Sequence, residues 1–118
     1  MKSYIYLKNT NFVIGASREG TCALISTYRF NDLEPDQKYE VIKTETIHEF
    51  GHVLGIPYNN RKTNVENNIG LHCTNKCVMS QGLCVPDDWI KFTEDRLRSG
   101  KPLCDQCVDD LNIYFSRK

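Results

Sequence analysis

The sequence has no excess of charge of either sign, no long hydrophobic run and only three histidines. Its 118 residues carry 15 basic and 15 acidic side chains, which gives nucleic acid or an anionic membrane no electrostatic attraction. No apolar run approaches the roughly 20 residues of a membrane span. Residues 1–8 lack the apolar segment and the cleavage site of a signal peptide. We therefore expect a cytoplasmic protein with neither a nucleic-acid nor a membrane partner.

A chain of this length is expected to form one compact domain, residues 1–118, and to bury about two-thirds of its unfolded surface. The hydrophobic core is then modest, and tightly bound metal would help to stabilise it. Six cysteines without a secretion signal favour metal ligands or buried thiols. A secreted protein held together by disulfides is the alternative.

The clearest motif is His-Glu-x-x-His-x-x-Gly at residues 48–55. On an α-helix His48 and His52 lie one turn apart on the same face, so both imidazoles can bind one metal ion. Glu49 can then act as the general base for a water at that metal, which is typical of zinc hydrolases. The alternative is a helix that carries two histidines on a solvated face, although chance rarely produces this spacing from three histidines.

Before the motif, alternation of apolar residues predicts strands at residues 4–7, 12–15 and 21–30, with Cys22 as a buried structural thiol. A helix should begin at Pro35 or Asp36 and end at Gly55, which permits the left-handed turn that closes a helix. Its core-facing stripe is expected to consist of apolar residues at helical spacing, namely Tyr39, Ile42, Thr46, Phe50, Val53 and Leu54.

After the motif, residues 56–71 contain five asparagines and no clear period, which predicts a surface loop. A second helix should begin near residue 86 and stop at Gly100, with four residues for burial: Trp89, Ile90, Phe92 and Leu97. Residues 104–107 lead into a short amphipathic helix at the C-terminal end.

A hydrolytic zinc site usually has three protein ligands and one open position. In the compact pattern the third histidine would stand at position 58, which is occupied by Tyr58. An insertion after Gly55 that delays the third ligand to His72 is the simplest explanation. Otherwise His72 is a partner of the neighbouring cysteines or a surface residue.

The spacings Cys73-x3-Cys77 and Cys104-x2-Cys107 have the paired form of a closed, four-thiolate zinc site. Such a metal would be structural, because four protein ligands leave no open position. Cys84 could replace one of the four or stay free. A thioredoxin-like function for residues 104–107 is not favoured, since no βαβ pattern surrounds them.

These motifs together resemble the archaemetzincins, zinc metallopeptidases of the metzincin clan. Their signature is His-Glu-x-x-His-x-x-Gly-x-x-His-Cys-x4-Cys-x-Met, followed later by Cys-x-x-Cys. The chain matches it at residues 48–55, at residues 72–79 and at residues 104–107. Residues 11–15 and 25–29 also resemble strands of that family.

The resemblance implies a catalytic zinc ion on His48, His52 and His72, with Glu49 as the general base. It implies that Met79 is the Met-turn residue beneath this site, where an ordinary core methionine is the alternative. It also implies a structural zinc ion, and so two zinc ions per chain, on the four spaced cysteines: Cys73, Cys77, Cys104 and Cys107.

Three departures from the family pattern stand out. Sixteen residues separate Gly55 from His72 where the pattern has two, and the gap between the first two cysteines is one residue shorter. Family members also carry about half a domain more before residue 12. A strand missing there would leave an open sheet edge, through which a homodimer is one expectation.

We therefore expect an α+β, metzincin-like zincin fold: a short mixed sheet, an active-site helix and a zinc-stapled C-terminal helical part. The expected function is zinc-dependent hydrolysis of a peptide or protein substrate, which the edge of residues 24–30 would bind as an added strand. Two alternatives stay open at this point. One is a non-catalytic zinc-binding or scaffold relative, and the other is a zinc hydrolase of a non-peptide amide.

Overall fold

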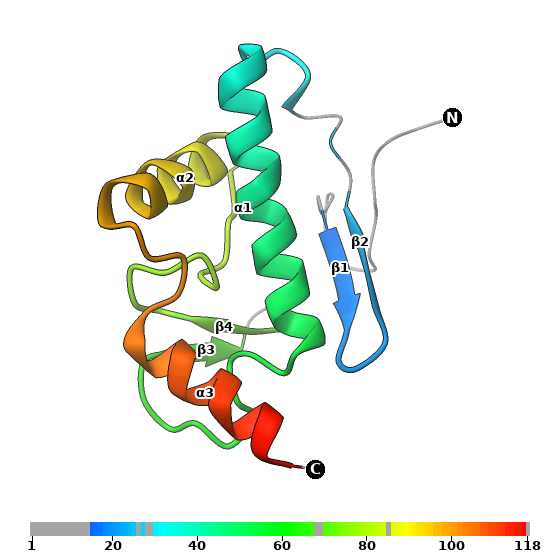
Figure 1. Cartoon of the computed structure of the whole chain (residues 1–118), viewed down its shortest axis with the longest axis vertical. Helices are drawn as coiled ribbons and strands as arrows, with labels where there is room; N and C mark the ends of the chain where they lie inside the picture. Colours follow the sequence, from blue (N-terminus) through cyan, green and yellow to red (C-terminus); the bar gives the residue numbers. More distant parts are fainter. Residues whose placement is uncertain (1–14, 26, 28–29, 68–69, 85, 118) are drawn as a thin grey trace.

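The computed structural model describes residues 15–25, 27, 30–67, 70–84 and 86–117 (Figure 1). Its elements follow in chain order: β1 (Gly15–Arg18), β2 (Cys22–Ile25), α1 (Pro35–Val53), β3 (Val65–Asn67), β4 (Leu71–Cys73), α2 (Asp87–Ser99) and α3 (Asp105–Ser116). The fold is α+β, as predicted. No helix in the described ranges combines the length and the apolar character needed to cross a membrane. The cytoplasmic location stays a prediction.

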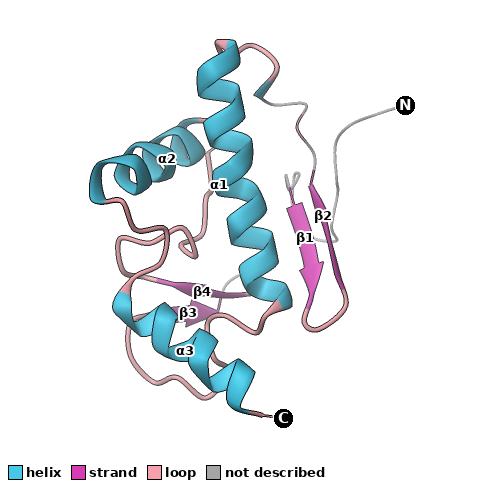
Figure 2. Cartoon of the chain, viewed as in Figure 1, coloured by secondary structure: helices cyan, strands magenta, loops and turns pink. Residues whose placement is uncertain are grey.

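Helix α1 is the central element of the molecule (Figures 1 and 2). It packs against the β1–β2 hairpin on one side and against α2 on the other. The β3–β4 hairpin and α3 lie near its C-terminal end in this view. The last two turns of α1, which carry the histidine motif, therefore face the segments that hold the third histidine and the cysteines.

Both ends of α1 follow from local sequence. Pro35 occupies the first turn, where its missing N–H costs no hydrogen bond, and Asp36 lies favourably at the positive end of the helix dipole. At the other end Gly55 adopts a left-handed φ of 74°. The amide of Gly55 donates to the carbonyl of His52 at 3.0 Å, and that of Ile56 donates to the carbonyl of Gly51 at 2.9 Å. This is a Schellman closure, and the predicted helix bounds are confirmed.

The predicted core-facing stripe of α1 is wrong for three of its six residues, whereas Ile42, Val53 and Leu54 are half-buried and Ile42 packs against a core cluster. Tyr39 and Phe50 are 65% and 58% exposed, and Thr46 is exposed and donates its hydroxyl to the carbonyl of Ile42. The buried face is instead largely polar and consists of Val41, Thr44, Glu45, His48, Glu49 and Gly51. The reason is that this helix turns mostly polar side chains to the interior, so apolar periodicity identifies only part of its buried surface.

Polar side chains also join α1 to α2. The hydroxyls of Thr44 and Thr93 lie 2.7 Å apart, and Arg96 Nε donates to Thr44 Oγ1 at 3.1 Å. Arg96 Nη2 in turn forms an ion pair with Glu40 Oε1 at 2.8 Å. The polar groups of Thr44, Thr93 and Arg96 therefore have partners, which is the condition for burying them without a large penalty.

The β1–β2 hairpin is antiparallel and pairs Arg18 with Cys22 and Gly15 with Ile25. Its tight turn uses Gly20 at a φ of 71°, where a side chain would be strained. The predicted strand over residues 21–30 ends at Ile25 within the described residues, and Phe30 is buried in a helical turn. The strand predicted at residues 4–7, and residues 12–14 of the next, lie outside the described residues.

One further prediction for the first half of the chain is wrong. Cys22 is exposed, because alternate residues of β2 point to opposite faces and the face that carries Cys22 and Leu24 is the exposed one among the described residues. The described strands form two separate antiparallel pairs, and the rest of the expected mixed sheet lies outside the described residues. Residues 56–71 are also more than a loop, since β3 lies within them and pairs with β4 through Val65 opposite Cys73 and Glu66 opposite His72.

Helices α2 and α3 lie where the sequence predicts them, although Leu97 is 56% exposed and does not join the core. The buried apolar residues form two clusters. One lies between α1 and α2: Phe30, Val41 and Trp89. The other surrounds the cysteines: Ile56, Cys73, Cys77, Val78, Met79 and Cys107. The second cluster depends on sulfur atoms, so its stability is linked to the state of the cysteines.

Candidate metal centres

The three histidines of the sequence come together in the structure. His48 and His52 project from the last two turns of α1, and His72 is the middle residue of β4. Their ring centroids are separated by 4.7 Å (48 to 52), 4.9 Å (52 to 72) and 5.4 Å (48 to 72). One nitrogen of each ring lies within 4.8 Å of the others. The hairpin of β3 and β4 thus brings a residue 20 positions beyond His52 to the same point.

Each imidazole is oriented by a backbone carbonyl. The Nδ1 atom of His48 lies 2.6 Å from the carbonyl oxygen of Val78, that of His52 lies 3.0 Å from Ile56 O, and that of His72 lies 3.0 Å from Gly70 O. A carbonyl only accepts, so each Nδ1 must carry the proton. Each ring is then the Nδ1–H tautomer, in which the Nε2 atom has a lone pair that can bind a metal ion.

The spacing of these lone pairs fits a zinc ion. The Nε2 atoms of His48 and His52 lie only 3.2 Å apart. With both protons held at Nδ1, this contact is no hydrogen bond and places two lone pairs against each other. Two nitrogens bound tetrahedrally to zinc at about 2.0–2.1 Å would lie about 3.3 Å apart, close to the observed separation. A cation between the rings removes the repulsion.

Burial keeps the three rings neutral. It lowers the pKa of His48 well below its usual value, and the proximity of His52 lowers it further. Burial and then His72 lower the pKa of His52 to about 4, and burial lowers the pKa of His72. Imidazoles with such pKa values are unprotonated at pH 7 and can donate to a metal without first losing a proton.

Two carboxyl groups stand beside the histidines on α1. Glu49 is nearly buried, and its Oε2 lies 3.8 Å from His48 Nε2. Glu45, one turn earlier, is fully buried. Burial, followed by the charge and hydrogen bonding of Glu49, raises the pKa of Glu45 well above its ordinary value. The neutral form of Glu45 is therefore favoured, which limits repulsion between the two carboxyl groups.

Met79 lies beneath this group and is fully buried. A Cβ atom added to Gly51 would lie 2.5 Å from Met79 Sδ, so the sulfur packs directly on the helix backbone. The preceding residue, Val78, supplies the carbonyl for His48, and the carbonyl of Met79 accepts the amide of Cys73 at 3.0 Å. The turn at residues 77–80 therefore supports both α1 and β4. Trp89 closes another side, with its ring edge-on to His48 at 4.9 Å.

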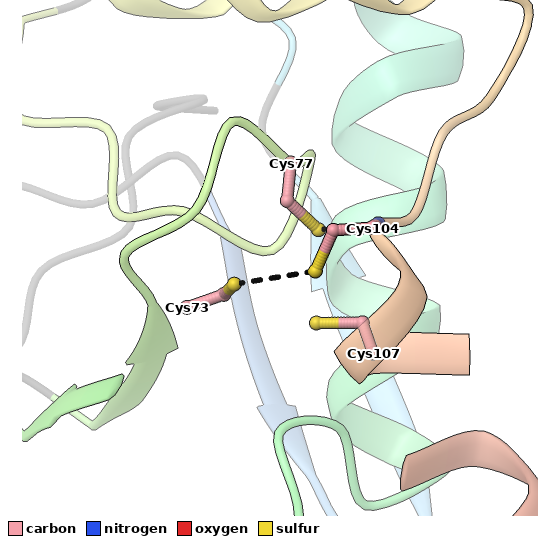
Figure 3. A group of neighbouring side chains, drawn as sticks. All are labelled: Cys73, Cys77, Cys104 and Cys107. Atoms are coloured by element: carbon pink, nitrogen blue, oxygen red, sulfur yellow. Dashed lines mark hydrogen bonds between the residues drawn. The ribbon is translucent and has the colours of Figure 1, made fainter. Parts of the chain in front are cut away.

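Four cysteines form a second group close by (Figure 3). Cys73 ends β4, Cys77 lies in the loop that follows, and Cys104 and Cys107 lie at the start of α3. Their ligand atoms lie within 4.8 Å of one another, and the Sγ atoms of Cys73 and Cys104 are 3.7 Å apart. Sulfurs bound tetrahedrally to zinc at about 2.3 Å would lie about 3.8 Å apart, so this donor set also fits zinc.

The cysteines show no sign of the disulfide alternative. All six lie in the described part of the chain, and all six are free thiols. Cys84 is exposed and lies outside the four-cysteine group, so it replaces none of the four. Tyr58 belongs to neither group. Its amide donates to Asp110 Oδ2, and its hydroxyl accepts from Asn60.

Nitrogen donors surround the four sulfurs. The Asn75 backbone amide lies 3.3 Å from Cys73 Sγ, its side chain lies 3.4 Å from Cys104 Sγ, and Arg61 reaches the sulfurs of Cys73 and Cys107. Hydrogen bonds from Cys107, Cys77 and Arg61 lower the pKa of Cys73, whereas bonds to Cys73 and Cys77 raise the pKa of Cys107. Ionising all four thiols thus calls for a cation.

The sequence reasoning did not find Arg61, Asn75 or Glu45. Arg61 lies in a segment without periodicity and reaches Cys107 across 46 positions, so no local pattern indicates it. Asn75, between two of the cysteines, was the one residue whose position offered a signal. The structure places the predicted residues together, while their roles as ligands, as general base and as Met-turn residue remain predictions.

The curated proteins that match this chain are named archaemetzincins. No protein-family model matches the chain. Archaemetzincins are 34% identical over 84 residues in Archaeoglobus fulgidus and 39% identical over 123 residues in Methanocaldococcus jannaschii. These alignments cover 70% and 95% of the chain, but only 44% and 56% of the relatives. A third, from Nanoarchaeum equitans, is 37% identical over 64% of the chain and 32% of its own length.

A solved structure is similar in fold as well. The crystal structure of archaemetzincin from Methanopyrus kandleri, determined at 1.5 Å, matches with a TM-score of 0.68 at 27% identity. The match covers 97% of the chain and 52% of the solved structure, so the chain spans about half the length of the relatives that it resembles. This agreement extends the zincin-like fold over nearly all of the chain. By sequence and by fold, the chain belongs to the archaemetzincin family.

Proposed function

We propose that the chain hydrolyses peptide bonds with a zinc ion held by His48, His52 and His72, and that a second zinc ion on the four cysteines maintains the fold. The observation that carries the proposal is the convergence of three Nε2 lone pairs, each fixed by an Nδ1 proton on a backbone carbonyl, beside a nearly buried carboxylate. Convergent neutral imidazoles with an adjacent carboxylate are the donor set of a hydrolytic zinc site.

A zinc ion bound there supplies a Lewis acid that acidifies water and polarises a carbonyl group. Glu49 accepts the proton of the attacking water through its carboxylate and later passes that proton to the nitrogen of the leaving amine. The low exposure of Glu49 favours this role, because few other solvent molecules can reach its carboxylate and compete with the reacting water. The backbone carbonyls of Val78, Ile56 and Gly70 keep the imidazoles in one orientation throughout.

Other groups are less suited to these roles. Glu45 is fully buried one turn away and has a raised pKa, which favours a neutral carboxyl group. The cysteine group offers four ligands and so leaves no coordination position for a substrate. Glu49 is therefore the carboxylate that the geometry favours as the base, and the histidine group is the favoured catalytic centre.

The test compares Glu49→Gln with Glu94→Gln, a matched change at an exposed position on α2. A broad mixture of peptides is incubated with each zinc-loaded protein, and cleavage is followed by mass spectrometry. We expect Glu49→Gln to lose about 10²–10⁴-fold in rate, since that is the usual contribution of a general base. Glu94→Gln should keep the wild-type rate, and both variants should keep the wild-type zinc content.

Three results would contradict the proposal. Turnover by Glu49→Gln within a few-fold of wild type would remove the assigned base. Wild-type protein that binds both zinc ions and cleaves no peptide would instead support a non-catalytic zinc-binding or scaffold role. Activity on small acylated amines without activity on peptides would assign the site to hydrolysis of non-peptide amides.

A further inference from the structure

Arg61 connects the segment between the second and third histidines to the cysteine group. It lies between α1 and β3, and its side chain is only 6% exposed. Arg61 Nη2 donates to Cys73 Sγ at 3.1 Å, and Nη1 donates to Cys107 Sγ at 3.4 Å. One guanidinium group therefore contacts one sulfur from each cysteine pair. Among the hydrogen bonds that the described residues make to the four sulfurs, these are the ones with a charged donor.

The remaining contacts of Arg61 fix its orientation. Nε donates to Thr63 O at 3.0 Å, and Nη2 also donates to Asn64 O at 2.7 Å. Nη1 forms an ion pair with Asp110 Oδ2 at 2.8 Å, and that carboxylate also accepts the amide of Tyr58 at 3.0 Å. The planar fork is thus held from three sides, so that two of its N–H groups point at sulfur without further ordering.

The net charge of the four-cysteine zinc centre explains why a nearby arginine stabilises it. Four thiolates and one zinc ion carry a net charge of −2, and they lie in the apolar cluster that contains Met79 and Ile56. A buried charge is costly unless it is paired and hydrogen-bonded. An arginine that donates to two of the sulfurs meets both conditions, and it stays charged at any working pH. Partners of this kind around metal ligands typically contribute 10–100-fold in metal affinity.

We propose that Arg61 is a positioning residue for the four-cysteine zinc centre: it holds the sulfur atoms of Cys73 and Cys107 in place and strengthens the binding of the metal. The inference rests on the structural zinc of the proposed function and is independent of peptide hydrolysis. It also gives a function to part of the segment of residues 56–71, which lies between His52 and His72 in the sequence. That segment carries a cation that offsets part of the negative charge of the centre.

Anchoring of the loop is the competing explanation. The amide of Thr74 donates to the carbonyl of Asn64 at 2.9 Å, and Gln106 contacts Asn64 and Thr63 through side-chain hydrogen bonds. Arg61 could stabilise this packing through Asp110 and the two carbonyls alone. In that case its loss would destabilise the protein equally with and without metal. It would also leave the electronic environment of the sulfurs unchanged.

The experiment loads the full chain with Co²⁺ and reads the thiolate-to-cobalt charge-transfer absorption, a signal that the histidine site does not give. Arg61→Met removes charge and donors, and Arg61→Lys keeps the charge but loses the fork. Arg98→Met, which breaks an exposed pair with Asp95, is the matched control. Affinity is measured by chelator competition. We expect Arg61→Met to weaken cobalt binding about tenfold or more and to move the charge-transfer band, with Arg61→Lys intermediate and the control unchanged.

A second variant separates the two explanations even if Arg61→Met folds poorly. Asp110→Asn breaks the ion pair with α3, while the carbonyls of Thr63 and Asn64 still hold the guanidinium group against the sulfurs. Cobalt affinity at or above the wild-type value in this variant supports the proposal. A loss as large as that of Arg61→Met overturns it in favour of loop anchoring.

The remaining outcomes are also decisive. A band position and affinity in Arg61→Met that match the control would overturn the role of Arg61 while leaving the four-cysteine centre in place. Equal destabilisation of metal-free and cobalt-loaded Arg61→Met would do the same. Absence of any thiolate-to-cobalt band in the wild type would refute the centre itself. None of these results depends on peptidase activity, so the two proposals fail separately.

Discussion

The three histidines and the four cysteines meet at adjacent residues, His72 and Cys73, yet the chain surrounds the two groups with opposite kinds of partner. Backbone carbonyls accept a hydrogen bond from each imidazole, whereas N–H donors from Arg61 and Asn75 point at the sulfurs. Neutral ligands leave the charge of a bound dication available to polarise a substrate. Four thiolates more than cancel that charge. The first environment suits catalysis and the second suits a structural site.

The two groups also differ in how they depend on the rest of the fold. His48 and His52 belong to one helix, so their spacing is set by α1 alone. The cysteines come from β4, a loop and α3, which the chain brings together only after folding. His72 is the exception among the histidines, because its strand continues directly into Cys73. Damage to the cysteine group should therefore reach the histidine group, whereas the reverse effect should be small.

The largest expected effect follows from this asymmetry. Wild-type protein dialysed against a weak chelator should keep close to two zinc ions per chain. Cys107→Ser should lose the structural zinc and most of the folded state, since binding at such sites contributes roughly 10–16 kcal/mol in small zinc domains. It should also weaken zinc at the histidines. Elemental analysis combined with thermal unfolding checks each statement.

The reciprocal variant is the control for that prediction. His52→Ala should keep one zinc ion and a cooperative unfolding transition close to that of the wild type, because α1 retains its packing against α2 and the β1–β2 hairpin. If His52→Ala unfolds as readily as Cys107→Ser, the two groups are equally structural and the comparison fails. A wild-type content near one zinc ion would remove one of the two sites.

A smaller effect tests which residue completes the histidine group. Replacement of His72 by Ala should weaken zinc binding at this site tenfold or more, as loss of a direct ligand should. Tyr58→Phe should leave it nearly intact, because the Tyr58 hydroxyl accepts a hydrogen bond from Asn60 and lies outside both ligand groups. Zinc titrations of the two variants decide the matter. The opposite order of affinities would make Tyr58 the ligand and would show that the third ligand was assigned incorrectly.

Short-range spacing explains what the sequence could predict. Residues three or four apart on a helix must share a face, so the bounds of α1 and the pairing of His48 with His52 follow from the sequence alone. The two cysteine pairs follow from their close spacing in the chain, which is typical of paired zinc ligands. Apolar periodicity failed for the buried face of α1, because it assumes an apolar interior. This helix turns Thr44, Glu45 and its two histidines inward.

Contacts between distant segments account for most of what could not be predicted. Arg61 meets Cys107 across 46 positions, and β3 becomes a strand only because β4 pairs with it. A segment of three residues, Val65–Asn67, carries too little periodicity to be recognised by itself. The close packing of Met79 on Gly51 is likewise a tertiary contact. No rule of local sequence relates a helix glycine to a methionine in a later turn.

That last contact gives the smallest predicted effect, and its sign depends on the background in which it is measured. Gly51 lies within α1, where Gly→Ala ordinarily adds about 1 kcal/mol of helix stability. A Cβ at this position would lie 2.5 Å from Met79 Sδ, and such overpacking typically costs about 1–3 kcal/mol. Gly51→Ala should therefore lower the free energy of unfolding by up to about 2 kcal/mol in urea titrations, and the shifted Met79 should disturb the histidine site before the cysteine site.

In a Met79→Ala background the obstacle is gone, so the same change should raise stability by up to about 1 kcal/mol. A double-mutant cycle measures the difference directly. Equal effects of Gly51→Ala in the two backgrounds would show that Met79 does not pack on the helix backbone.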